Sequence, residues 1–233
     1  NNSKKSFTGK VLVGADGAGS ITAKLGGFPY LPLTNFALAY EAEFSDVNVE
    51  RDSCYVFIEP EFKKFFAWMV PCSQDVARIG FGTTDLHGFE NAKKMLYSLP
   101  ILKEIRDGKK VREFSHLIPL SARSKTQKEN VLLVGDAAGQ VKATTGGGIV
   151  YGGNCAFIAG RETSNYLEGG LLNYESEWRK RFGGYIAAHS FSRSFLNLFG
   201  GPAFLKAFKL FGGKTILENF GDMDFFIKKK MPG

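Results

Sequence analysis

Hydrophobic and polar residues are arranged differently in successive parts of this chain. Residues 9–16 contain a short apolar run that leads into Gly14-Ala15-Asp16-Gly17. This pattern is typical of a strand followed by a turn. Ser20 is then a candidate N-cap for a short helix over 21–25. From residue 36 apolar and polar residues alternate, so a different kind of structure is expected to begin there.

Four alternating segments follow, at 36–44, 54–58, 65–70 and 76–83. Because side chains on a strand alternate between two faces, this pattern predicts an antiparallel sheet with one buried face. Apolar residues at helical spacing predict a helix over 88–107. A strand is predicted over 111–118, and Pro119 opens a polar crossover that continues through 124–130.

A second continuous apolar run, Val131–Val134, returns the chain to the first kind of structure. It is bounded by Asn130 and Gly135, as a buried strand should be, and a helix of small apolar residues is predicted to run to about residue 167. The expected fold class is α/β (α+β), with one discontinuous domain wrapped around an inserted antiparallel-sheet domain. The expected parts are 1–30, 31–118, 119–170 and a helical C-terminal region, 171–233.

Within that C-terminal region, helices are predicted over 171–181, 185–199, 202–211 and 215–227. The third is amphipathic, with lysines that alternate with phenylalanines. It is interpreted as a basic, membrane-facing helix or as a domain-packing helix. The pattern consists of Phe204, Lys206, Phe208, Lys209, Phe211 and, just beyond the predicted helix, Lys214.

The composition is that of a globular protein, with 233 residues, 44% hydrophobic and 23% charged. No apolar stretch is long enough to span a membrane, and three scattered cysteines favour a reducing cytoplasm. The net charge of +7 suits an anionic partner. A lipid surface at the membrane periphery is favoured over nucleic acid, because no nucleic-acid-binding motif accompanies the charge; a solvated basic surface is the alternative. The three isolated histidines suggest no metal site.

The residues after the second apolar run are suited to a flat, polar cofactor. Asp136 stands at the tip of the predicted strand, and an acid that only caps a loop is its alternative interpretation. The helix that starts at Ile149 offers unpaired N–H groups and a positive dipole end. Five glycines around these residues have no Cβ atoms to hold a ligand away from the backbone. They are Gly135, Gly139, Gly146, Gly147 and Gly148.

These residues resemble the second FAD-contacting segment of flavoproteins with the p-hydroxybenzoate hydroxylase fold, and among them the geranylgeranyl reductases. The resemblance implies that Asp136 binds the ribityl chain of FAD and that Gly146–Ile149 face its isoalloxazine ring. VLVGADGAGS at 11–20 looks like the family's GADGxxS motif, which implies that Asp16 and Gly17 lie under the diphosphate. A plain Asp-Gly turn is the alternative there. In these terms 1–30 and 119–170 are parts of a Rossmann-like FAD-binding domain, and 31–118 is the substrate domain.

FAWMVP at 66–71, followed by Gly80-Phe81-Gly82, resembles the reductases' YxWxFP…GxG signature. Phe66 replaces the usual Tyr and Val70 the usual Phe, so the ring-and-proline pattern stands without the Tyr hydroxyl. Plain core packing is the alternative for the rings. The resemblance implies a substrate pocket made by Tyr55, Phe66, Trp68, Pro71, Gly80 and Gly82.

The strand–helix unit with GxGxxG spacing, which binds the ADP part of FAD, does not occur in this sequence. GADGAG and TGGGIVYGG have the wrong spacing, and in the resembled family the unit precedes the GADG segment. Two explanations are open: the sequence is a piece of a longer product, which we favour, or a second chain completes it. This chain alone is expected to bind FAD weakly or not at all.

The resemblance implies FAD-dependent reduction of C=C bonds in isoprenoid (geranylgeranyl) chains of membrane lipids, with NAD(P)H or ferredoxin as the electron donor. Tyr55, Cys54 and Cys72 are candidate proton donors by location only, and both thiols are expected to be buried and inert. A flavin monooxygenase or halogenase would share both FAD segments. A truncated chain that binds lipid but no FAD is the non-enzymatic alternative.

Overall fold

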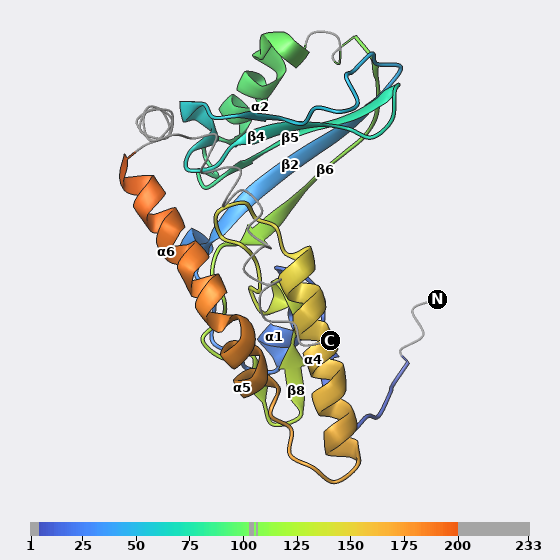
Figure 1. The fold of residues 1–233 in the computed structure, drawn as a ribbon, viewed down its shortest axis with the longest axis vertical. Helices are drawn as coiled ribbons and strands as arrows, with labels where there is room; N and C mark the ends of the chain where they lie inside the picture. Colours follow the sequence, from blue (N-terminus) through green and yellow to red (C-terminus); the bar gives the residue numbers. More distant parts are fainter. Residues whose placement is uncertain (1–4, 103–104, 106, 200–233) are drawn as a thin grey trace. The chain divides into compact units, whose positions relative to one another are not determined.

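The computed structural model describes residues 5–102, 105 and 107–199, which form two compact units (Figure 1). Of the described residues, unit 1 combines those up to Phe36 with Leu117–Ser192, and unit 2 combines those between Ala37 and His116 with Arg193–Phe199. The chain therefore leaves unit 1, builds the sheet of unit 2 and returns. The predicted mixed α/β class with an antiparallel sheet is confirmed.

Unit 1 contains a three-stranded sheet in the order β1-β8-β7. β1 (Leu12–Gly14) runs parallel to β8 (Val131–Leu133), with Gly14 opposite Leu133. β7 (Gln127–Lys128) pairs antiparallel with β8, within the stretch predicted as a polar crossover. Leu132 and Leu133 are completely buried, because a central strand with both faces covered requires a continuous apolar run.

Two helices of unit 1 begin and end at residues with clear capping roles. α1 (Ile21–Leu25) starts where predicted, because Ser20 Oγ accepts a hydrogen bond from Ala23 N at 2.9 Å. α4 (Ile149–Leu167) stops before Gly169, whose φ of +96° is left-handed and suits glycine. Its buried stripe follows helical spacing and consists of Tyr151, Cys155, Ile158, Ala159 and Glu162.

The helices after residue 171 belong largely to unit 1. α5 (Tyr174–Trp178) is anchored by its two completely buried aromatic ends. Trp178 donates from Nε1 to Thr126 Oγ1 at 2.7 Å, and Tyr174 donates to the backbone oxygen of Leu133 at 2.7 Å. A π-helical turn over Arg179–Gly183 leads into α6 (Gly184–Phe199).

Unit 2 contains a five-stranded sheet in the order β3-β4-β5-β2-β6. Its central strands run antiparallel, with Tyr40 opposite Phe81 and Met69 opposite Ile79. Each alternating segment of the sequence overlaps one of these strands, so the period-two pattern predicts the sheet correctly. The strands are β2 (Phe36–Ser45), β3 (Tyr55–Phe57), β4 (Ala67–Pro71), β5 (Val76–Thr83) and β6 (Lys109–Pro119).

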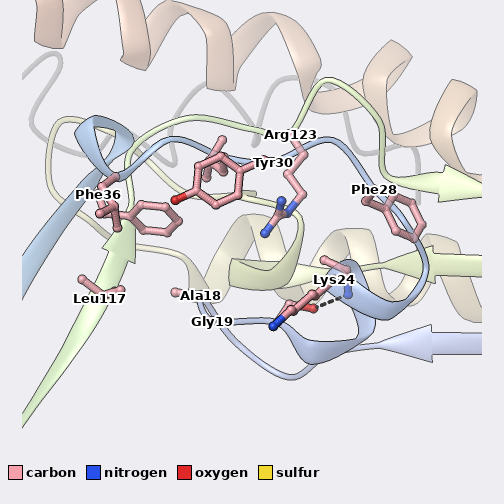
Figure 2. A pocket seen from close by; sticks show the side chains of 12 residues that line it. Ala18, Gly19, Lys24, Phe28, Tyr30, Phe36, Leu117 and Arg123 are labelled. Carbon is pink, nitrogen blue, oxygen red and sulfur yellow. Dashed lines mark hydrogen bonds between the residues drawn. The ribbon is translucent and has the colours of Figure 1, made fainter.

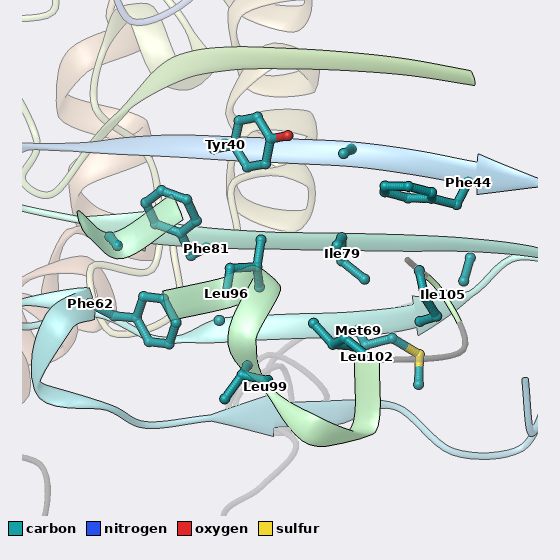
Figure 3. Close-up of a cluster of buried hydrophobic side chains, with 14 of the residues drawn as sticks. Tyr40, Phe44, Phe62, Met69, Ile79, Phe81, Leu96, Leu99, Leu102 and Ile105 are labelled. Atoms are coloured by element: carbon teal, nitrogen blue, oxygen red, sulfur yellow. The ribbon is translucent and has the colours of Figure 1, made fainter. Parts of the chain in front are cut away.

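α2 (Phe89–Ser98) covers one face of this sheet and closes its hydrophobic core (Figures 1 and 3). Ile79 and Phe81 on β5 and Leu96 on α2 are completely buried. Phe62, from a 3₁₀ turn over Pro60–Phe62, stacks on Phe81 with the ring centroids 5.7 Å apart. Full burial of such a side chain contributes about 1.5–3 kcal/mol, so this cluster is the main stabilising feature of unit 2.

The helix predicted over 88–107 is interrupted after Ser98. α2 ends at Ser98, and Leu99 is extended, with φ −60° and ψ 125°. Pro100 explains the early end, because its ring disfavours a helical conformation in the preceding residue. A 3₁₀ turn over Pro100–Leu102 follows and still buries Leu99 and Leu102 in the core. Two further 3₁₀ turns span Leu33–Asn35 and Gly135–Ala137.

Within the described ranges, no helix has the length and apolar character needed to cross a membrane. The helices predicted over 202–211 and 215–227 lie outside the described residues, and so does the Lys–Phe pattern from Phe204 to Lys214.

Candidate functional site

The parallel pairing of β1 with β8 brings two loops to one edge of the unit 1 sheet. Val134 N donates to Gly14 O at 2.9 Å, so the loop from Ala15 and the loop from Gly135 leave the sheet at the same edge. In α/β sheets, ligands bind beyond the carboxyl ends of the strands. The structure therefore gathers at this edge five of the residues predicted to contact a cofactor: Asp16, Gly17, Gly135, Asp136 and Gly139.

The loop after β8 is a tight turn supported by a buried amide. Gln140, which is completely buried, accepts from Gly135 N at 2.9 Å through Oε1 and donates from Nε2 to Tyr174 OH at 2.8 Å. Gly139 has φ +71°, and a Cβ there would collide with the backbone oxygen of Ser121. The turn is thus fixed from the protein side, and position 139 admits no side chain.

Gly17 and Gly135 differ from Gly139 in having free space beside them. Their φ angles are +77° and +61°, and no atom lies within 4 Å of the position that a Cβ would take. A left-handed glycine with open space leaves the backbone bare on one side. This geometry suits the close approach of a flat ligand to both turns.

α4 begins directly beside the loop after β8. Gly148 is its N-cap and offers no capping side chain, and a Cβ on Gly148 would lie 2.9 Å from Asp136 Oδ1. Asp136 therefore lies against the N-terminal end of α4, where the helix dipole is positive. Gly146, with φ +76°, makes the turn into the helix, and Ile149 is 92% exposed on its first turn. The start of α4 is therefore accessible at this edge of the sheet.

Gly147, the middle glycine of the three, departs from the bare backbone that the sequence predicts. Its carbonyl oxygen accepts from Lys142 N at 2.9 Å, and its N–H donates to Thr145 Oγ1 at 3.4 Å. A Cβ on Gly147 would lie 3.0 Å from Lys142 Cε, so the lysine side chain already occupies the space beside this glycine. The observed role of Gly147 is to close the turn before α4, and its contact with an isoalloxazine ring stays a prediction.

Both carboxyl oxygens of Asp16 are engaged by their own loop. Oδ1 accepts from Ser20 Oγ at 2.6 Å, and Oδ2 accepts from Thr22 N at 2.8 Å. Desolvation raises the pKa of Asp16, but these hydrogen bonds outweigh it and hold the pKa at about 2. The observed role of Asp16 is thus to fix Gly17 and the start of α1 as an ionised acid; its contact with a diphosphate stays a prediction.

Unit 1 also has a cavity of about 490 Å³ beside the loop after β1 (Figure 2), which the sequence pattern does not predict. Arg123 is its most unusual lining residue, because this cation is only 8% exposed. Its Nε donates to Ala137 O at 2.7 Å and its Nη1 to Pro29 O at 2.9 Å. Nothing in the sequence distinguishes Arg123 from the basic residues that follow it, Lys125 and Lys128.

The predicted substrate residues divide between the two faces of the unit 2 sheet. Trp68 lies opposite Gly80, and its ring forms an edge contact with Phe66, with centroids 6.0 Å apart. A Cβ on Gly80 would meet the Trp68 ring, and one on Gly82 would collide with the Phe65 ring. The space left by both glycines is therefore filled by the protein's own aromatic rings.

Tyr55 and Pro71 belong to the other face. Tyr55 lies opposite Met69, which is buried in the core beneath α2, and Pro71 is two residues beyond Met69 on the same strand. The Tyr55 hydroxyl donates to Glu50 Oε2 at 3.2 Å. The structure thus brings Phe66, Trp68, Gly80 and Gly82 together and separates Tyr55 and Pro71 from them.

A carboxylate that the sequence pattern does not single out lies on the Trp68 face. Glu41 is opposite Gly80 on β2, and its Oε2 accepts from Trp68 Nε1 at 3.3 Å. Its neighbour on the same face, Glu43, accepts from Arg78 at 2.8 Å and from Arg112 at 2.9 Å, so the pKa of Glu43 is lowered. Strand alternation alone would predict both acids on a solvated face.

The expectation that Cys54 and Cys72 are buried is wrong, because both are exposed. Cys54 precedes β3 and Cys72 follows β4, so the turns at the ends of these strands leave the thiols in solvent. Cys155 on α4 is buried, and burial raises the pKa of its thiol to about 12. A thiol with that pKa stays protonated and inert at neutral pH.

Several proteins are similar to this chain in sequence, although no protein-family model matches it. An uncharacterized protein of Methanocaldococcus jannaschii is 34% identical over 182 residues, which cover 76% of this chain and 47% of that protein. Digeranylgeranylglycerophospholipid reductase 2 of Methanothermobacter thermautotrophicus is 28% identical over 183 residues, which cover 74% of this chain and 47% of that protein. The chain thus spans about half the length of these curated relatives.

Solved structures show the same fold at low sequence identity. A geranylgeranyl bacteriochlorophyll reductase-like protein from Thermoplasma acidophilum aligns with a TM-score of 0.72 at 17% identity, over 91% of this chain and 62% of that one. The flavin-dependent brominase Bmp2 aligns with a TM-score of 0.67 at 14% identity, over 85% of this chain and 53% of that one. The resemblance to the geranylgeranyl reductase family is confirmed by these comparisons, and the chain has the fold of flavin-dependent enzymes.

Proposed function

We propose that this chain supplies the flavin-facing loops and the substrate sheet of a FAD-dependent reductase that saturates C=C bonds of isoprenoid chains in membrane lipids. One observation carries the proposal: the β1–β8 pair places the Asp16-Gly17 and Gly135–Gly139 loops at one sheet edge, beside the start of α4. The relatives named as digeranylgeranylglycerophospholipid reductases support the substrate class.

The residues at this edge fit a flavin. Gly17 and Gly135 leave open space where a Cβ would stand, and Asp136 would accept hydrogen bonds from the ribityl hydroxyls. The first turn of α4, without a capping side chain, would direct N–H groups and its positive dipole end at an electron-rich ring edge. Reduced flavin, when bound, would supply the hydride for one alkene carbon, and an acid of the protein or water would supply the proton for the other.

The edge of β1 supports the view that a further strand completes the cofactor domain. β1 is at the end of its sheet among the described residues, and it exposes Leu12 (56%) and Val13 (42%). Nearby, Leu25 on α1 is 81% exposed. An unpaired edge with apolar neighbours is normally covered by another segment. A strand–helix unit with GxGxxG would pair with β1 and supply the ADP-binding unit that this sequence does not contain.

The Trp68 face of unit 2 is proposed as the wall that positions the alkene. Phe66 and Trp68 offer an apolar surface that would orient an isoprenoid chain and exclude water. Because Trp68 and Phe65 fill the space over Gly80 and Gly82, the isoprenoid would lie on the rings rather than between them. Glu41, bonded to Trp68, would orient that ring. NAD(P)H or ferredoxin is the proposed electron donor, and the basic surface is the proposed contact with lipid.

The test compares the chain alone with the chain joined behind a GxGxxG strand–helix unit from a curated relative. The joined protein should be yellow, and after reduction it should convert digeranylgeranylglycerophospholipid to a product with two more hydrogens per saturated bond, as read by mass spectrometry. Gly135→Ala should abolish the flavin absorbance, because its Cβ enters the open side of the turn. Gly160→Ala, on α4 with equally open surroundings, is the matched control and should leave it unchanged.

Two outcomes would overturn the proposal. If the joined protein is folded but stays colourless, the loops at this edge of the unit 1 sheet do not hold FAD. If it binds FAD but modifies its substrate only with dioxygen or with dioxygen and halide, it is a monooxygenase or halogenase. Flavin-dependent halogenases share the fold, so product analysis under anaerobic conditions is the decisive measurement.

A further inference from the structure

The cavity beside the loop after β1 combines a buried cation with an apolar wall. It lies entirely within unit 1, and its volume of about 490 Å³ is in the range of small-molecule sites. In Figure 2 the guanidinium of Arg123 lies between the rings of Phe28 and Tyr30 and points toward Gly19 and Lys24. Charge and apolar surface therefore face the same space.

Arg123 keeps one donor group turned toward the cavity. Its Nε and Nη1 are held by the backbone oxygens of Ala137 and Pro29, whereas among the described residues no hydrogen bond from Nη2 is found. Burial lowers the pKa of Arg123, and the charge of Asp16 partly offsets this effect. A desolvated guanidinium with a free N–H pair binds an anionic oxygen more strongly than an exposed one.

The local charge favours an anionic group. Arg123 and Lys24 contribute two positive charges, and Asp16, ionised with a pKa of about 2, contributes one negative charge. Both oxygens of Asp16 are already bonded to Ser20 and Thr22, so they leave Nη2 of Arg123 to a ligand. A phosphate monoester carries up to two negative charges and matches the remaining donors.

The rest of the wall offers little to a polar ligand body. Ser20 Oγ is committed to Asp16 and to Ala23 N, and Tyr30, 76% exposed, lies at the rim. The other lining side chains are alkyl groups or phenyl rings. They include Phe28, Leu31 and Phe36, each 7% exposed, and Leu33 and Leu117.

We propose that this cavity binds the phosphate of an apolar chain, with the phosphate on Arg123 and Lys24 and the chain along Phe28, Leu31 and Phe36. The ligand class agrees with the lipid substrate of the proposed function. The site depends on the residues of the cavity alone, and its binding measurement uses no flavin. A failure to bind farnesyl phosphate would therefore leave the proposed function standing, and a failure to bind flavin would leave this site standing.

The experiment measures equilibrium binding to the full chain by calorimetry, with farnesyl phosphate as the probe. Farnesol lacks the charge, inorganic phosphate lacks the chain, and AMP has a polar body. Farnesyl phosphate should bind at least tenfold more tightly than each of the other three. Equal binding of farnesol or of AMP, or no saturable binding of farnesyl phosphate, would overturn the proposal.

Two matched pairs of variants locate the site. Gly19→Phe fills the cavity without a collision, since no atom lies within 4 Å of its Cβ position, and it should weaken binding at least tenfold; Gly160→Phe, equally open on α4, should not. Lys24→Glu should weaken binding, and Lys10→Glu, outside the cavity, should change it much less. Arg123→Met should remove the preference for the phosphate over farnesol. If Gly19→Phe binds like the unmodified chain, the ligand lies elsewhere and the proposal is wrong.

Discussion

The glycines of the two units serve opposite purposes. On β5 in unit 2, Gly80 and Gly82 make room for Trp68 and Phe65, so the missing side chains are replaced by the protein's own rings. At the carboxyl edge of the unit 1 sheet, Gly17 and Gly135 are left-handed and face open space. Glycine spacing in a sequence therefore indicates that space is needed at a position, but the fold decides whether protein or ligand fills it.

Gly139 is a third case, in which glycine is required by the fold and not by a ligand. It belongs to the same loop as Gly135, yet its Cβ position is occupied by the backbone of Ser121. Backbone cannot rotate away as a side chain can. A series of glycine-to-alanine substitutions would therefore rank these sites by what opposes the new methyl group.

The largest effect is expected for Gly139→Ala. The substitution combines a left-handed φ of +71° with a collision against backbone, and we expect unit 1 to lose about 3–5 kcal/mol of unfolding free energy. Trp178 fluorescence during urea unfolding, in a Trp68→Phe background, reports this unit because Trp178 is completely buried. Gly153→Ala on α4, with open surroundings, should be neutral or stabilising; equal destabilisation by both would contradict the ranking.

An intermediate effect is expected for Gly82→Ala in unit 2. Its Cβ would meet the ring of Phe65. The substitution should therefore lower the unfolding free energy by about 1–3 kcal/mol, and the loss should depend on that ring. Phe65→Leu removes the ring. In a double-mutant cycle, adding it to Gly82→Ala should recover at least about 1 kcal/mol of the lost unfolding free energy. Additive free energies in thermal unfolding would show that the ring does not occupy this space.

The smallest effect is expected for Asp16→Asn, and it should depend on pH. The pKa of Asp16 is about 2 in the folded chain, below the value of about 3.9 for an unfolded aspartate. Its contribution is therefore complete above about pH 4 and disappears as the pH falls toward 2. Because Asp16 is exposed, we expect Asp16→Asn to lower the unfolding free energy at pH 7 by less than about 1 kcal/mol. Calorimetry at pH 7 and pH 2.5 measures the stability difference between the unmodified chain and the variant. A stability difference that grows in acid would contradict the observed hydrogen bonds of Asp16.

Much of the fold is accessible from hydrophobic periodicity. Strand alternation predicts the unit 2 sheet, and the Ser20 cap predicts the start of α1, because both depend on local rules. The end of α2 escapes the pattern although Pro100 is visible, since the apolar spacing continues past it into a 3₁₀ turn. The two-residue strand β7 also escapes it, because its pairing with β8 depends on tertiary contacts.

The candidate site can be predicted only where motif and topology agree. The parallel β1–β8 pair follows from the two apolar runs that end in glycine and acid. The supporting role of Gln140 and the burial of Arg123 depend on segments that meet only in the fold, so no local pattern marks them. Similarly, alternation identifies Trp68 as half-buried but cannot show that its ring covers Gly80.

The β1–β8 pairing has a consequence for the order of events during synthesis. Leu12 pairs with Val131, and every strand of the unit 2 sheet is encoded between them. A ribosome that releases the chain from its N-terminus therefore delivers the whole unit 2 sheet before it delivers β8, which pairs with β1. Unit 2 can form first and shorten the loop that β1 and β8 must close. Until then one edge of the apolar β1 segment lacks the strand that covers it in the folded unit.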